Sequence, residues 1–199
     1  MKPRTPGFWL IVATVGLLAL LPMQAFAGMT PKEVKAFEGF KALAERGDAE
    51  AQLNLGLCFD NGSGVAKDQV QAVSWYRKAA EKGYAKAQYR LGFCYRYGLG
   101  VDADQVQAVS WYRKAADQGD ARAQDSLAAH CRIGEGVAKD VIEAYAYWSL
   151  AGITYERARR SLAVLEKQMS GDQIVAGKKR AKELQKEIEA RILAKKAGK

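Results

Sequence analysis

The feature that most constrains the fold is a twelve-residue sequence, QVQAVSWYRKAA, that occurs twice without a single change. The two copies occupy residues 69–80 and 105–116, an offset of 36 residues. Upstream of each copy, DNGSGVAKD at 60–68 aligns with RYGLGVDAD at 96–104 and then with RIGEGVAKD at 132–140. A fixed period of this length is typical of stacked repeat arrays, in which each unit contacts only its neighbours. The sequence therefore predicts three copies of a 36-residue unit.

Each unit predicts two helices joined by a glycine-containing loop. In the first unit, apolar residues at helical spacing indicate a helix over 49–61, and Gly56 leaves room for a close neighbour. Asp68 is placed to cap a second helix over 69–82. We expect that helix to bury its alanines with Trp75 and Tyr76, and to expose Arg77 and its polar neighbours. The residues expected on the outer side are Gln71, Ser74, Arg77 and Lys78.

Segments outside the repeats predict capping helices. Thr30, Pro31 and Glu33 have the spacing of a capped helix start, so residues 30–46 are expected to form a half-repeat. After the third unit, a further first-type helix is expected near 158–165. Ser170 and Gln173 then form a capping box for a last helix. We expect that helix to cover the exposed end of the stack as far as about Ile188 and to fray beyond it.

The first 27 residues have the pattern of a secretory signal peptide. Lys2 and Arg4 precede an apolar run at 8–21, and Ala25-Phe26-Ala27 forms an A-x-A site. The alternative is an uncleaved anchor, but the run is shorter than the ~20 residues that span a bilayer. We therefore expect cleavage after Ala27 and a periplasmic or secreted protein. The expected division is a signal peptide at 1–27, a repeat solenoid at 28–170 and a basic C-terminal helix and tail at 171–199.

Within residues 28–199, the excess of basic over acidic side chains lies entirely in the C-terminal segment. Residues 28–155 contain 16 basic and 16 acidic side chains, whereas residues 156–199 contain 13 basic and 6 acidic ones. A segment of this sign can contact an anionic membrane surface, nucleic acid or an acidic partner. The alternative is an ordinary solvated helix, because Glu and Lys are interleaved.

The cysteine and histidine positions argue against disulfide and metal chemistry. Cys58 and Cys94 occupy equivalent places on successive units, about 8–10 Å apart, which exceeds the ~7 Å Cα separation of a disulfide. Cys131 is expected in the core, so we predict free, buried thiols, with an intermolecular bond left open by the odd count. His130, the only histidine, stands in phase with Cys58 and Cys94 and is interpreted as a packing residue. We expect no catalytic site, no metal and no cofactor.

Two aligned segments, AQLNLGLCFDNGSGVAKDQVQAVSWYRKAAEKGYAKA and AQYRLGFCYRYGLGVDADQVQAVSWYRKAADQGDARA, resemble the motif of the Sel-one-like (Sel1-like) repeat family. This family is a relative of the tetratricopeptide repeat, and the resemblance covers roughly residues 30–195. It implies an all-α, right-handed α-solenoid of helix-turn-helix repeats. It also implies a protein-binding or assembly scaffold, commonly in the bacterial periplasm. The third copy departs from the motif, with Ala128 in place of a glycine.

In a tetratricopeptide-like arrangement, first helices line the concave surface. There, Tyr89, Phe93 and Tyr97 stand at positions i, i+4 and i+8, separate from the core register. Together with nearby arginines they have the composition of interface hot spots. The alternative is that these aromatics pack against neighbouring helices, as most such stripes do. The candidate partner-binding residues are Leu53, Leu57, Tyr89, Phe93, Arg96, Tyr97, Arg122 and Arg132.

We therefore expect an exported scaffold or adaptor that binds a peptide or protein partner in the groove of an α-solenoid. The alternative hypothesis is a cell-envelope factor that binds anionic membrane or cell-wall polymer through its basic C-terminal helix. An enzyme is not expected, and neither is a nucleic-acid partner.

Overall fold

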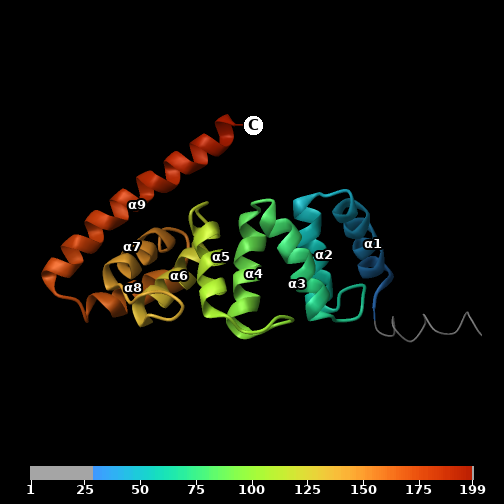
Figure 1. Ribbon diagram of the computed structural model, residues 1–199, viewed down its shortest axis with the longest axis horizontal. Helices are drawn as coiled ribbons and strands as arrows, with labels where there is room; N and C mark the ends of the chain where they lie inside the picture. Colours follow the sequence, from blue (N-terminus) through green and yellow to red (C-terminus); the bar gives the residue numbers. More distant parts are fainter. Residues whose placement is uncertain (1–28, 199) are drawn as a thin grey trace, which may run out of the picture.

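The computed structural model describes residues 29–198, and this part of the chain is entirely helical apart from its loops (Figure 1). The predicted signal peptide lies outside the described residues. Within them, no helix is both long enough and apolar enough to cross a membrane. The helices are α1 Pro31–Glu45, α2 Ala49–Asn61, α3 Gln69–Glu81, α4 Ala85–Tyr97, α5 Gln105–Ala116, α6 Ala121–Ile133, α7 Val141–Ala151, α8 Glu156–Glu166 and α9 Gly171–Ala197.

The first eight helices follow one another in a single row, from α1 at one end to α8 at the other (Figure 1). Each repeat contributes one pair, α2 with α3, α4 with α5 and α6 with α7, and consecutive pairs pack together. The predicted α-solenoid is confirmed, and the boundaries predicted for α1, α2 and α3 are correct to within a residue. The capping boxes predicted at Thr30 and Ser170 are both present.

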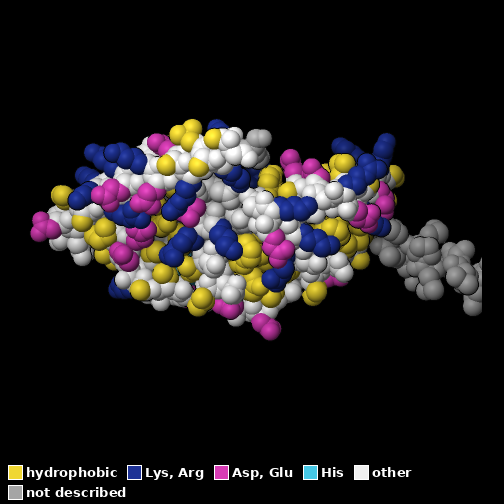
Figure 2. Space-filling view, turned by 45° about the horizontal axis from the view of Figure 1, so that its top comes forward, with side chains coloured by type: hydrophobic (Ala, Val, Ile, Leu, Met, Phe, Trp, Pro, Cys, Tyr) yellow, Lys and Arg dark blue, Asp and Glu magenta, His cyan; other side chains and the backbone are white. Residues whose placement is uncertain are grey.

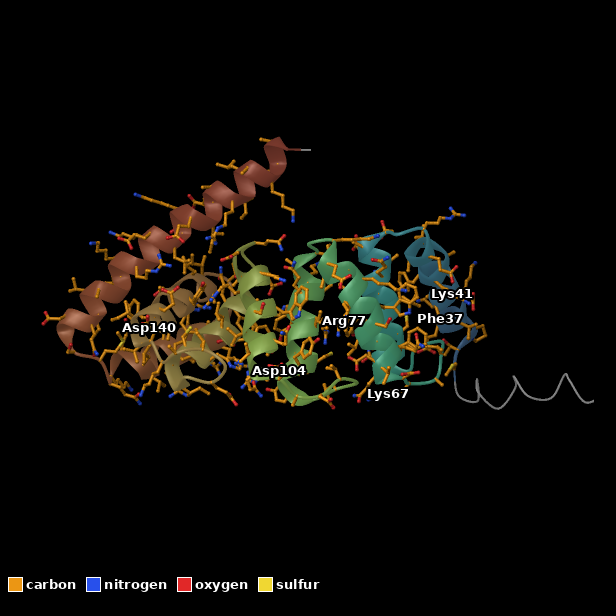
Figure 3. All side chains as sticks on the ribbon, in the orientation of Figure 1. Phe37, Lys41, Lys67, Arg77, Asp104 and Asp140 are labelled. Carbon is orange, nitrogen blue, oxygen red and sulfur yellow. The ribbon has the colours of Figure 1, made fainter. Side chains whose placement is uncertain are left out.

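Recurring polar residues fix the helix ends. Asp68, Asp104 and Asp140 each accept a backbone N–H at the start of the second helix, at 2.9–3.0 Å. Two of them are labelled at the starts of α5 and α7 in Figure 3. A buried glutamine near the start of each first helix donates to the last turn of the preceding helix. The donor–acceptor pairs are Gln52 to Ala44, Gln88 to Ala80 and Gln124 to Ala116. These bonds tie each unit to the one before it.

The second glycine of each loop sets the distance between units. Gly100 and Gly136 have φ near +69°, and a Cβ added there would lie 2.2–2.3 Å from the carbonyl oxygen of Gln69 or Gln105. These carbonyls belong to the first residues of α3 and α5. Only glycine combines this backbone conformation with so close an approach. Each loop therefore sits directly on the preceding unit.

The inner faces of α3 and α5 pack as predicted, with one difference. Tyr76 and Tyr112 are fully buried, and their rings lie against Gly56 and Gly92 of the paired first helix. Trp75 is only partly buried, because its ring lies on the surface beneath the Lys78 ammonium.

The expectation that Arg77 lies on the solvent side is wrong. Its Nη2 donates to the Tyr95 hydroxyl at 2.9 Å, and its side chain lies between α3 and α4 (Figure 3). The expectation considered one repeat at a time, whereas the partner of Arg77, Tyr95, belongs to the next repeat.

The expected course of the last helix is also wrong. Helix α9 does not fray after Ile188 but continues to Ala197, running back along the row over α7 toward its middle (Figure 1). Its Gly177, Leu184 and Ile188 are buried, and Gly177 lies against the Tyr145 ring. Farther along, Lys195 donates to the Gly83 carbonyl and to Gln118. The helix thus bridges the closing loops of the earlier repeats as well as the last one.

Candidate functional site

The first helices share one register of side chains along one side of the array, which we call the first-helix face. The register runs through Leu53, Leu57 and Asn61 in α2, and through Tyr89, Phe93 and Tyr97 in α4. In α6 and α8 the equivalent residues are Asp125, Ala129, Ile133, Arg160, Val164 and Gln168, with α8 displaced by one deleted residue. The three repeats have different residues at each of these positions in α2, α4 and α6.

Three aromatic side chains on α4 form a continuous ladder. The Tyr89 and Phe93 ring centroids are 6.5 Å apart, and those of Phe93 and Tyr97 are 4.6 Å apart, all tilted. Tyr89 is half-buried and also contacts the Tyr112 ring at 5.9 Å, whereas Tyr97 is 53% exposed. Both interpretations of the stripe therefore hold in part, since its inner end packs on α5 and its outer end faces solvent.

Two arginines lie over this ladder. The Arg122 guanidinium carbon is 4.8 Å from the Tyr89 ring centroid, and that of Arg96 is 5.1 Å from the Tyr97 ring centroid. Arg122 also forms an ion pair with Asp120 at 3.4 Å. Arg96 makes no ion pair within residues 29–198. An arginine that lies over an aromatic ring can still bind a carboxylate through its N–H groups.

The remaining predicted site residues lie on either side of the ladder, in α2 and in α6. Leu53 is buried in the core and presents almost no surface, and Leu57 is partly buried. Arg132 is exposed at the end of α6, one repeat beyond Arg96. The structure therefore brings Tyr89, Phe93, Arg96, Tyr97 and Arg122 together and places Arg132 farther along the same surface.

Asp125 makes contacts that the sequence did not indicate. Its carboxylate accepts from Trp148 Nε1 at 2.9 Å and pairs with Arg157 Nε at 3.1 Å, although it is only 3% exposed. Burial raises the pKa of this carboxyl, and the nearby Arg157 and the Trp148 hydrogen bond offset the effect only in part. Asp125 therefore joins α6, α7 and α8 beneath the first-helix face.

The histidine and the thiols are packing residues. His130 is fully buried, its Nδ1 lies 2.9 Å from the Glu135 carbonyl, and burial lowers its pKa. Cys58, Cys94 and Cys131 are free and buried, as predicted, and burial raises the pKa of Cys131 to about 11. Within the described residues, no three His, Cys, Asp or Glu side chains gather as a metal site requires.

The basic helix α9 uses part of its charge within the molecule. Arg180 binds Glu143 and Glu187, and Arg191 binds Asp117 at 2.6 Å. Several lysines remain exposed, and basic and acidic groups lie intermixed where α9 crosses the surface at the upper left of Figure 2. The exposed ones include Lys178, Lys179, Lys182 and Lys186.

Comparison with known proteins agrees with the repeat boundaries. The sequence profile of the Sel1 repeat matches residues 49–84, 85–120 and 121–152. Among curated proteins, no significant match to the chain was found.

Two solved structures are similar in fold. A Sel1 repeat protein from Oxalobacter formigenes is 34% identical, with a TM-score of 0.61 over 67% of this chain and 58% of that one. A protective antigen present in uropathogenic Escherichia coli strains, which displays an SLR fold, is 28% identical. Its TM-score is 0.57 over 81% of this chain and 43% of that one. This chain therefore spans about half the length of these relatives.

Proposed function

Because this chain belongs to the Sel1 repeat family, whose members generally act as protein-interaction scaffolds, we propose that it binds a protein segment on its first-helix face. The observation that supports this proposal is the aromatic ladder of α4 with Arg96 and Arg122 over it. Tyrosine and arginine are enriched among the hot-spot residues at the centre of protein interfaces. Helix α9 packs on α7 and leaves this ladder open.

The experiment is capture of the partner by cross-linking in intact envelopes, followed by its identification and a direct binding measurement. Replacing Phe93 and Arg96 together by alanine removes the middle ring and one guanidinium. We expect an affinity loss of at least tenfold with unchanged helical content. Gln71→Ala with Ser74→Ala on the outer surface of α3 is the matched control, and both residues are exposed. Equal binding by the two double variants would overturn the proposal.

We also propose that the chain acts outside the cytoplasm, because residues 1–27 have the pattern of a signal peptide. The expected mature protein begins at Gly28. Mass measurement of the protein recovered from a periplasmic extract tests this, and an intact Met1 start in that extract would contradict it.

A second candidate function is binding of an anionic envelope surface, supported by the exposed lysines of α9. Deleting α9 would also remove the buried Leu184 and Ile188, so charge substitution is the cleaner test. Replacing Lys178, Lys179, Lys182 and Lys186 by glutamine should abolish sedimentation with phosphatidylglycerol vesicles at low salt. Sedimentation that is unchanged by the substitution, or absent in the wild type, would contradict this candidate.

A further inference from the structure

A hollow of about 380 Å³ lies on the first-helix face between α6 and α8, two helices beyond the aromatic ladder. It arises from a difference between repeats. The position filled by Leu57 in α2 and by Phe93 in α4 is occupied by Ala129 in α6. The small side chain leaves unfilled the space that a phenylalanine ring takes up one repeat earlier.

The interior of the hollow is apolar. Trp148 and Leu165 are almost completely buried beneath it, while Val164 on its α8 side is 58% exposed. Ser161 and Gln168 supply polar groups along the α8 side. A concave apolar site with a few polar groups of this size suits one bulky apolar side chain.

Two arginines flank the hollow, Arg132 from α6 and Arg160 from α8. Arg132 forms no ion pair within residues 29–198. Arg160 pairs only with Glu156 at 2.5 Å, and both side chains are mostly exposed, so this pair is weak and easily exchanged. The buried Asp125 carboxylate, which lies beneath α6 and α8, is already bound to Arg157 and Trp148. The local charge is therefore positive and favours carboxylate ligands.

We propose that this hollow is an anchor pocket for an acidic protein segment. A bulky apolar side chain of the segment enters between Ala129 and Val164, and neighbouring carboxylates bind Arg132 and Arg160. The pocket rests on the proposed function, because it extends the same binding surface from α4 to α8 and specifies the chemistry of the partner. The carboxylate can come from an acidic side chain or from the C-terminus of the partner.

Defined peptides test the pocket with the purified full chain. The probes are fluorescein-labelled octapeptides in a Gly/Ser background, acetylated and amidated, with Phe between two Asp residues. The comparison peptides replace both Asp by Asn, or Phe by Ala, and a fourth ends on Phe with a free carboxylate. We expect anisotropy to show at least tenfold tighter binding of the Asp-Phe-Asp peptide, or of the free-carboxylate peptide, than of the Asn and Ala forms. Which of the two binds identifies the source of the carboxylate.

Two variants separate shape from charge. Ala129→Phe places in α6 the side chain that α4 already carries, and should remove the tenfold preference by filling the hollow. Arg132→Gln with Arg160→Gln should weaken the acidic peptide at least tenfold and leave the Asn peptide unchanged. Both variants alter exposed or partly exposed positions, and circular dichroism tests whether each variant is folded. Equal binding of all peptides, binding of none, or unchanged binding by folded Ala129→Phe would overturn the pocket.

Failure of the pocket is distinguishable from failure of the proposed function. If the Phe93 and Arg96 double variant releases the captured partner and Ala129→Phe does not, the pocket is wrong and the proposed function stands. If neither variant releases the partner, the first-helix face is not the binding surface.

Discussion

Helices α3 and α5 contrast with α7, which is the second helix of the third repeat. The first two have the same twelve residues, with polar side chains outward and two buried tyrosines inward. In α7 the outward residues change to Glu143, Ala146 and Leu150, where α3 has Gln71, Ser74 and Lys78. Ala146 is fully buried, whereas Ser74 and Ser110 are exposed. The third copy is not simply degraded, because its altered surface is the one that α9 covers.

Two residues of α7 that differ from α3 contact α9 directly. Arg180 binds the Glu143 carboxylate at 2.7 Å, and Gly177 lies on the ring of Tyr145, which replaces Val73 and Val109. The inner face of α7 changes too, since Trp148 takes the place of Tyr76 and Tyr112 and bonds to Asp125. The difference teaches that a terminal repeat gains its stability from a partner helix that interior repeats do not need.

The largest effect on stability is expected at the two loop glycines that lie against the identical starts of α3 and α5. Gly100→Val and Gly136→Val each force a branched side chain into a left-handed backbone and against the start of α3 or α5. Strain and overlap together should lower the free energy of unfolding by about 4 kcal/mol in both variants. Urea denaturation measures this. Gly39→Ala, which meets no atom within 4 Å in α1, is the control and should raise stability by up to about 1 kcal/mol. If only one valine variant lost much stability, the loop contacts with α3 and α5 would not be equivalent.

Converting the outer face of α7 into that of α3 should detach α9. The quadruple variant Glu143→Gln, Tyr145→Val, Ala146→Ser and Leu150→Lys removes the ion pair and the apolar contact. We expect a loss of about 3 kcal/mol, by analogy with large-to-small changes in a core, and rapid tryptic cleavage within residues 171–197. Gln71→Glu on α3 is the control and should change stability by less than about 0.5 kcal/mol. Continued protection of α9 in the quadruple variant would show that α7 does not hold it.

The inner face of α7 is tested at Asp125. Asp125→Ala leaves the Trp148 N–H and the Arg157 guanidinium without their acceptor, and should cost about 2 kcal/mol. Thermal and urea unfolding measure the loss. Leu53→Ala, at the equivalent position of α2, removes only apolar contact and leaves no polar group unpaired.

Asp125 also predicts a pH dependence. Its pKa in the folded protein is raised above its ordinary value of 3.8, so the folded state binds a proton more readily than the unfolded chain. The corresponding stability is present at low pH and is lost as pH rises through the raised pKa. Relative to Asp125→Asn, the wild type should therefore gain stability as the pH falls from 7 toward 4. A constant difference between the two proteins across this range would contradict the raised pKa.

The sequence alone predicted the repeat architecture well, because its signals are local. The 36-residue period, the capping aspartates and the loop glycines each act within one unit or between adjacent units. The position of α9 was missed because it depends on contacts between segments far apart in the chain, such as Lys195 with Gly83. One signal was present: Leu150 replaces a lysine on an outward position, which indicates a covered surface.

The candidate site was predictable in part for the same reason. The Tyr89–Phe93–Tyr97 spacing follows from one helix, and the structure confirms that these rings form a ladder. The register predicts Leu53 on the same surface, yet this side chain is buried in the core. The hollow at Ala129 could not be found from spacing, because a cavity depends on the volumes of residues from three helices.

The smallest predicted effect concerns one residue that α3 and α5 share. Arg77 donates to the Tyr95 hydroxyl of the next repeat. For Arg113, the residue equivalent to Tyr95 is Cys131, which has no hydroxyl, and the Arg113 side chain is exposed. Arg77→Gln should cost about 1 kcal/mol and Arg113→Gln less than about 0.5 kcal/mol. Adding Tyr95→Phe to each variant in a double-mutant cycle isolates the bond. Coupling in the Arg77 cycle alone would show that the same arginine contributes differently to stability in α3 and α5, because the following repeats differ. Equal costs without coupling would mean that the Arg77 contact adds nothing to the stability of the array.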